Sequence, residues 1–230
     1  MKTVNITRLE NGEINETQDL IADEVSLKVI LNDKKLAEFS CSGTYVNELI
    51  IGYLYYYGYI NLPGDISSLS YDIEKETVQI ELQNSPSSYM NGIVAPTREY
   101  NADNIFSLME AFVSKSDKFL KTGAVHSAGI ANDEGIIVSF DDLSRHNTLF
   151  MLLGYSLTQN VLLSDKILLV TCRLTKSIID IILKANIRTI VTKAAPTNLA
   201  VETCKKNNIA LAGFVRGNRM NIYNKSSLFL

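Results

Sequence analysis

The sequence predicts an α/β fold in its larger, C-terminal part, because short apolar segments alternate with helical patterns from about residue 120 onward. This order of strands and helices favours right-handed crossovers and a largely parallel sheet. The first hundred residues or so predict a smaller α+β part, in which alternating strands surround one apolar helix. Hydrophobic residues make up 46% of the 230 residues and charged residues 20%, so the chain can bury a core and is not of the disordered class.

The N-terminal part is expected to contain three half-buried strands, because apolar and polar residues alternate in each of them. These strands are expected at residues 25–31, 36–41 and 77–82. An apolar, tyrosine-rich helix is predicted through residues 49–54, with Thr44 as its N-cap and its end near Gly58.

A long irregular loop is predicted at residues 84–100, which contain two prolines and a glycine and show no apolar period. Asp103 is the expected cap of a helix that then runs to Val113. We therefore divide the chain into an N-terminal part, residues 1–100, and a C-terminal part, residues 101–230.

The C-terminal part continues as alternating strands and helices. Strands are expected at residues 124–131, 136–140, 167–171, 189–192 and 209–214. Helices are expected at residues 145–160, 175–185 and 198–207. The carboxyl ends of parallel strands meet at one edge of a sheet, where the following helices begin with free N–H groups.

Three predicted junctions between a strand and a helix carry polar residues. The junctions are residues 141–147, 171–175 and 193–198, and their possible helix caps are Ser144, Thr175 and Thr197. Helix N-termini that converge with Arg145, Arg173 and Lys193 predict an anion site suited to phosphate or pyrophosphate. The plainer interpretation is that these residues are ordinary caps and solvated charges.

The chain has only two histidines and three cysteines. Arg145 disfavours the imidazolium form of His146, so a neutral hydrogen-bonding or stacking role suits that residue. His126 follows a strand-like segment and is either a site residue or a histidine of the core. Cys172 is the candidate reactive thiol, because a helix start and Arg173 would lower its pKa; the alternative is a small buried residue.

A polar cluster follows the last predicted strand. Its members are Phe214, Val215, Arg216, Gly217, Asn218 and Arg219. An aromatic ring with two guanidinium groups can stack on a base and hold a phosphate, and a glycine allows a turn with positive φ. The alternative is a hairpin turn with solvated arginines.

Several function classes lack support in the sequence. The net charge of −3 does not favour nucleic acid as a partner, and the chain has neither a signal-peptide core nor an apolar run long enough to span a membrane. The cysteines are widely spaced, which predicts neither a disulfide framework nor a zinc motif and fits a cytoplasmic setting. No P-loop, GxGxxG, HExxH or GxSxG motif occurs, and a nucleotide-processing enzyme would lack a recognisable base or metal set.

Taken together and in order, these motifs resemble the FdhD/NarQ family of formate dehydrogenase accessory proteins. The matching segments are Cys41-Ser-Gly, Glu48-Leu-Ile-Ile-Gly-Tyr-Leu54, Gly123-Ala-Val-His-Ser-Ala128, Asp141-Asp-Leu-Ser-Arg-His-Asn147, Ala195-Pro-Thr-Asn-Leu-Ala200 and the segment from Gly213 to Tyr223. The resemblance implies a three-layer, cytidine-deaminase-like C-terminal part and a homodimer.

The resemblance also implies the passage of sulfur from a cysteine desulfurase to the molybdenum cofactor of formate dehydrogenase or a related molybdoenzyme. The expected cargo is the molybdenum bis(molybdopterin guanine dinucleotide) cofactor, of which GDP would be a fragment. The implied binding residues are His126, Arg145, His146, Asn147, Arg173, Pro196, Thr197 and the cluster from Phe214 to Arg219.

The chain departs from the family pattern where sulfur would be carried. The family's two loop cysteines correspond to Asn91 and Val94, and its Asp-Lys pair in the helix after residue 144 has become Phe150-Met151. The rival hypothesis is therefore a non-catalytic module that binds the cofactor or a guanine nucleotide as a carrier or regulator. Cys172 is the candidate that keeps sulfur chemistry open.

Overall fold

The computed structural model describes residues 1–83 and 100–225. The predicted irregular loop, including Asn91 and Val94, lies outside the described residues except for Tyr100, which is buried.

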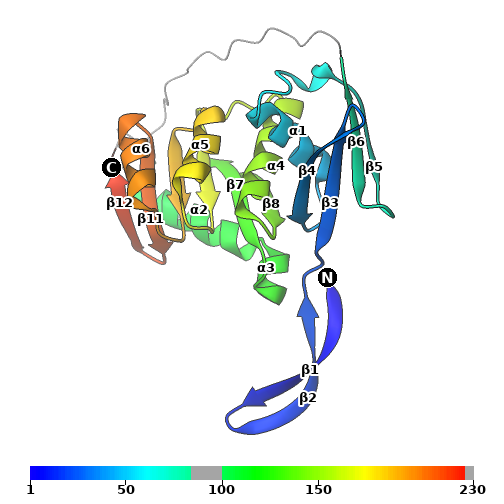
Figure 1. Cartoon of the computed structure of the whole chain (residues 1–230). Helices are drawn as coiled ribbons and strands as arrows, with labels where there is room; N and C mark the ends of the chain where they lie inside the picture. The colour runs from blue at the N-terminus through cyan, green and yellow to red at the C-terminus, as the bar shows by residue number, and fades with distance from the viewer. Residues whose placement is uncertain (84–99, 226–230) are drawn as a thin grey trace.

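A six-stranded sheet forms the centre of the C-terminal part (Figure 1). Its order is β12-β11-β10-β9-β7-β8, formed by Arg219–Asn224, Ala210–Arg216, Thr189–Thr192, Ile167–Val170, His126–Asn132 and Gly135–Asp142. β9, β10 and β11 are parallel, whereas β7–β8, β7–β9 and β11–β12 are antiparallel. The prediction of a largely parallel sheet is therefore wrong at both sides, where short turns join consecutive strands into hairpins.

Helices cover both faces of this sheet, which gives three layers. One face is covered by α4, α5 and α6 (Arg145–Thr158, Lys176–Lys184 and Asn198–Lys206) and the other by α2 (Ala102–Ser114). Successive residues of β9 point to opposite faces: Leu168 packs in the core with Ile178 of α5, and Leu169 packs in the core with Phe112 of α2. The predicted α/β fold class is confirmed.

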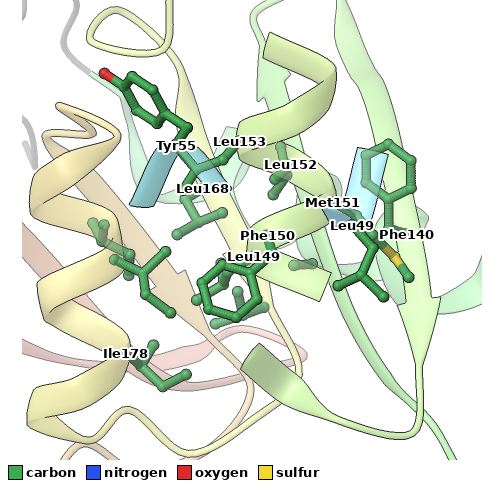
Figure 2. Close-up of a cluster of buried hydrophobic side chains, with 14 of the residues drawn as sticks. Leu49, Tyr55, Phe140, Leu149, Phe150, Met151, Leu152, Leu153, Leu168 and Ile178 are labelled. Carbon is green, nitrogen blue, oxygen red and sulfur yellow. The ribbon is translucent and has the colours of Figure 1, made fainter. Parts of the chain in front are cut away.

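The N-terminal part contains a four-stranded sheet and one helix that packs on α4. The sheet order is β4-β3-β6-β5, formed by Lys34–Cys41, Val25–Leu31, Thr77–Leu82 and Ile66–Asp72, and the helix α1 spans Val46–Tyr56. α1 and α4 cross in close contact, because a Cβ on Gly52 would lie 1.8 Å from the Phe150 carbonyl oxygen and one on Gly154 would lie 2.0 Å from that of Glu48. Phe150 and Met151 lie in the core shown in Figure 2. Burial therefore explains why an apolar pair stands at these two positions.

Two predicted helix caps are wrong. α1 has Tyr45 at its N-cap position with φ 55°, and the Thr44 hydroxyl instead lies 2.9 Å from the Ser42 hydroxyl and 3.1 Å from Lys118 Nζ. α2 is capped by Asn101, whose side chain accepts a hydrogen bond from the Asn104 N–H at 2.8 Å, so Asp103 lies inside the helix. In both cases the helix begins at a different residue from the one that the side-chain pattern predicts.

The sequence analysis did not list six elements among its predicted strands and helices. They are β1 and β2 (Lys2–Glu10 and Glu13–Ile21), the 3-10 turn η1 (Pro63–Asp65), β5, α3 (Asp117–Thr122) and β12. β1 and β2 form a hairpin that projects from the rest of the chain (Figure 1). No described helix is both long and apolar enough to cross a membrane.

Candidate functional site

The edge of the large sheet where β8, β9, β10 and β11 end brings the predicted junctions together. β7 is antiparallel to its neighbours, so its first residue, His126, lies at this same edge and pairs with Asp142, the last residue of β8. The Lys193 N–H donates to the Val170 carbonyl at 3.0 Å and the Phe214 N–H donates to the Ala194 carbonyl at 3.0 Å. Backbone hydrogen bonds therefore connect the segment after β10 to the ends of both β9 and β11.

The junction between β8 and α4 is organised by a buried carboxylate. Asp142 accepts hydrogen bonds from the Ser144 N–H at 3.0 Å, from Asn147 Nδ2 at 2.8 Å and from the Ser42 N–H at 2.8 Å. Asn147 Nδ2 also donates to the Ser40 carbonyl at 2.9 Å. The predicted binding residue Asn147 is thus buried and occupied in joining α4 to β4, and a direct ligand contact from its amide N–H groups would break these bonds.

Ser144 caps α4 as predicted, since its hydroxyl accepts from the His146 N–H at 3.3 Å. This cap places Arg145 and His146 in the first turn of the helix, where free N–H groups and the helix dipole favour an anion. His146 Nε2 lies 3.1 Å from the Ser177 hydroxyl of α5, so its ring bridges two helix N-termini.

Arg145 sets the electrostatics of this part of the edge. Burial, followed by the charges of Arg145 and Arg173, lowers the pKa of His126 below its ordinary value of 6.5. Burial and the charge of Arg145 lower the pKa of His146 in the same way, as the sequence predicted. Arg145 Nε itself is buried and has no hydrogen-bond partner among the described residues. A buried donor without an acceptor is costly, so this geometry favours an anion beside Arg145.

The junctions after β9 and β10 run side by side. The Leu174 N–H donates to the Ala195 carbonyl at 3.0 Å, and the Thr197 N–H donates to the Leu174 carbonyl at 2.9 Å. Thr197 caps α6 with a 3.4 Å bond from the Ala200 N–H, as predicted. Thr175 is at the N-cap position of α5, but its hydroxyl lies 3.0 Å from that of Ser177 and makes no cap bond.

Cys172 is buried, with 3% of its surface exposed, and precedes α5, which begins at Lys176. Its carbonyl accepts from the Thr192 hydroxyl at 2.8 Å. Burial raises the pKa of the Cys172 thiol to about 11, although Arg145 and Arg173 act in the opposite direction. The expectation that a helix start and a guanidinium make this thiolate favourable is therefore wrong, because desolvation outweighs both effects.

The predicted cluster from Phe214 to Arg219 forms the hairpin between β11 and β12. Arg216 lies directly opposite Arg219, and Gly217, with φ 51°, and Asn218 form the turn between them. Like charges in a direct cross-strand pair repel each other, and a bound anion would relieve that repulsion. Phe214 has φ 54°, an unfavourable backbone conformation for a bulky residue, at an irregularity in the pairing of the two strands.

A cavity of about 670 Å³ lies between this hairpin and α2. It is lined by residues 215–218, by Lys193, by Leu120 of α3 and by one side of α2 that includes Asp103, Phe106 and Glu110. Phe214 and Arg219 do not line it. The predicted residues thus share one edge of the sheet but not one pocket. The group around Arg145 lies at the starts of α4 and α5, and residues 215–218 line a cavity beside α2.

Sequence reasoning missed three contributors to this edge. Asp142 follows a second aspartate, Asp141, and the sequence did not indicate which of the two accepts the hydrogen bonds at the start of α4. The apolar residues of α2 were assigned only to the core, although Phe106 also lines the cavity. Ser127 has a buried hydroxyl without a hydrogen-bond partner among the described residues, and nothing in its sequence context indicates this.

Comparison with known proteins assigns the chain to a family. The sequence model of the FdhD/NarQ family matches residues 22–92 and 88–229. The chain belongs to the FdhD/NarQ family. It is 27% identical to the sulfur carrier protein FdhD of Geobacillus kaustophilus (strain HTA426), over 96% of this chain and 94% of that protein. It is 28% identical to the sulfur carrier protein FdhD of Listeria innocua, over 95% and 94%.

A solved structure has the same fold. The crystal structure of a formate dehydrogenase accessory protein from Desulfotalea psychrophila matches with a TM-score of 0.86 and 20% identity, over 100% of this chain and 99% of that chain. The family assignment confirms the resemblance that the sequence motifs indicated.

Proposed function

We propose that this chain is an accessory protein of formate dehydrogenase maturation that binds the molybdenum bis(molybdopterin guanine dinucleotide) cofactor as cargo. The observation that carries the proposal is the buried, unpartnered Nε of Arg145 at converging helix N-termini. A phosphate group of the cargo would supply the missing acceptor.

The cavity beside α2 suits the guanine part of such a cargo. Phe106 offers a ring on which a base can stack, and the carboxylate of either Asp103 or Glu110 can accept hydrogen bonds from the N1–H and amino group of guanine. Lys193 and Arg216 supply positive charge at the same cavity. Guanine and phosphate thus find complementary groups along one edge of the sheet.

Calorimetry with GDP, a fragment of the cargo, tests the proposal. Arg145→Ala is expected to weaken GDP binding at least about tenfold, because a charge-assisted hydrogen bond to phosphate is lost. Lys205→Ala is the matched control, since Lys205 is an exposed cation in the last turn of α6, at the far end of that helix from the site. Equal affinity of the wild type and Arg145→Ala, or equal binding of GDP and ADP, would contradict the proposal.

Sulfur carriage from a cysteine desulfurase is the family role and the second candidate function. The three cysteines, Cys41, Cys172 and Cys204, are all free and buried, and burial raises the pKa of each thiol. These observations favour binding without sulfur transfer in the free protein. Persulfide labelling after incubation with a cysteine desulfurase and cysteine separates the two functions, because a persulfide on any cysteine would restore the sulfur-carrier role. The homodimer and the cytoplasmic location stay predictions.

A further inference from the structure

A second cavity lies at the edge of the large sheet where β9 and β10 begin, opposite to the edge that carries Arg145. Its volume is about 440 Å³, a size typical of small-molecule sites. It is lined by residues between 153 and 164, in the last part of α4 and the segment before β9, by residues 184–186 at the end of α5, and by Tyr55 and Leu62. α4 and α5 begin at the Arg145 edge and end here, so this cavity is separate from the one beside α2.

The walls of this cavity are mostly apolar. Its aliphatic lining residues are Leu62, Leu153, Leu157, Val161, Leu162 and Leu163. Figure 2 shows Tyr55 beside Leu153, and both residues line the cavity. A smaller void of about 10 Å³ shares Leu153 and Leu163 with it and is lined only by leucine, isoleucine and alanine. The cavity therefore suits a ligand with an apolar body.

The buried polar group of the cavity is the hydroxyl of Ser164. Ser164 is 1% exposed, and its Oγ has no hydrogen-bond partner within the described part of the chain. The Ser156 hydroxyl lines the same cavity but donates to the Leu153 carbonyl at 2.8 Å. A buried hydroxyl without a partner is costly, so the geometry favours a ligand that brings a hydrogen-bonding group to Ser164.

The charged group of the cavity is Lys184, the last residue of α5. It is exposed, and its Nζ lies 4.6 Å from the centroid of the Tyr55 ring. No carboxylate among residues 1–83 and 100–225 forms an ion pair with it, and none of the described residues that line the cavity is acidic. The carbonyl groups of residues 181–183 accept hydrogen bonds from the N–H groups of residues 185–187, so they are not free acceptors that would repel an anion. A carboxylate on the ligand would pair with Lys184.

We propose that this cavity binds an aromatic carboxylic acid with a hydroxyl group on its ring, the carboxylate at Lys184 and the hydroxyl at Ser164. Lys184 is exposed and Ser164 is buried, so the two polar ends of the ligand lie at different depths. A flat ring between them fits the apolar walls, can pack against Tyr55, and loses little conformational freedom on binding. The inference goes beyond the nucleotide proposal, because this cavity lies at the other edge of the sheet.

Calorimetry with three related compounds tests the chemical class. The probe is para-hydroxyphenylpropanoate, which is expected to bind with a Kd of roughly a millimolar or less. Phenylpropanoate lacks the ring hydroxyl and is expected to bind about fivefold more weakly, because Ser164 stays unpaired. Para-hydroxyphenylpropanamide lacks the charge and is expected to bind about tenfold more weakly, because Lys184 has no carboxylate to pair with.

Two variants assign the ends of the ligand. Lys184→Met is expected to abolish the preference for the acid over the amide, and Ser164→Ala the preference for the hydroxylated acid over phenylpropanoate. Lys206→Met is the matched control, because Lys206 is the exposed last residue of α6 and does not line the cavity.

Two further measurements keep the result separate from misfolding and from the nucleotide proposal. Ser164→Ala is expected to be at least as stable to denaturant as the wild type, because a buried hydroxyl without a partner is removed. GDP affinity is expected to be unchanged in Lys184→Met. No binding of the probe at millimolar concentration, equal affinity for the three compounds, or variants that keep both preferences would overturn the inference.

Discussion

The junction between β8 and α4 and the turn between β11 and β12 lie at the same edge of the sheet but differ in how their polar groups are satisfied. At the first, Asp142 is buried and accepts three hydrogen bonds that fix the start of α4. At the second, Arg216 faces Arg219, neither of them forms an ion pair with a carboxylate among residues 1–83 and 100–225, and Phe214 has a positive φ. The carboxylate network of the first region is therefore satisfied in the free protein, although Arg145 Nε beside it lacks a partner among the described residues. The second region carries unfavourable charge repulsion and backbone conformation. A bound anion would offset the unpaired Arg145 Nε at the first region and the arginine repulsion at the second.

Replacing the organising carboxylate is the strongest test of this difference. Asp142→Asn is expected to lower the free energy of unfolding by about 3 kcal/mol, because a charged acceptor of buried N–H groups is lost. Chemical denaturation measures the change. Asp117→Asn is the control, since its exposed pair with Lys121 is expected to contribute no more than about 0.5 kcal/mol. An Asp142→Asn variant as stable as the wild type would contradict the assigned role.

The thiol of Cys172, at the junction between β9 and α5, is expected to be unreactive. With a pKa of about 11, Cys172 has roughly a hundredfold less thiolate at neutral pH than an ordinary thiol with a pKa of 9.0. Iodoacetamide labelling of the folded protein, followed by mass spectrometry, is expected to be slow and to accelerate as the pH rises toward 11. The same labelling in urea is the control. Rapid modification of folded Cys172 at neutral pH would restore it as a candidate for sulfur chemistry.

A smaller effect is expected at the turn. Arg216→Ser removes the direct repulsion of Arg219 and is expected to raise the free energy of unfolding by about 0.5 kcal/mol at low ionic strength. Salt screens exposed charges, so the gain is expected to vanish at high salt. Denaturation at two salt concentrations measures it. A loss of stability at low salt would show that Arg216 stabilises the hairpin by contacts other than charge.

The sequence predicted the elements that have a clear apolar period and missed those without one. β3, β6 and the strands and helices between residues 124 and 216 bury one or both faces, so their patterns are readable. β1, β2 and β12 contain no fully buried residue, so their apolar period is weak, although Asn11-Gly12 is a strong hairpin signal. The helix α3 has no buried residue, so it left no apolar pattern to read.

The sequence predicted at which edge of the sheet the site lies, but not which of the side chains at that edge are accessible to a ligand. Cap residues and basic residues located the junctions, because local chemistry determines where helices begin. The burial of Cys172 and the occupation of Asn147 depend on contacts with Thr192 and Ser40, which are distant in the sequence. Local patterns carry no information about such contacts, so both residues resembled ligand-binding or reactive groups.

The most direct test of the account follows the two imidazole rings by NMR as a function of pH. His126 and His146 are the only histidines, and in the free protein the pKa of each is expected below 6.5. An anion beside Arg145 stabilises the protonated imidazole, so saturating GDP is expected to raise the pKa of His126, and GDP binding should tighten as the pH falls through that pKa. If GDP binds and neither histidine pKa moves, the phosphate does not lie at this edge, and the central claim is wrong.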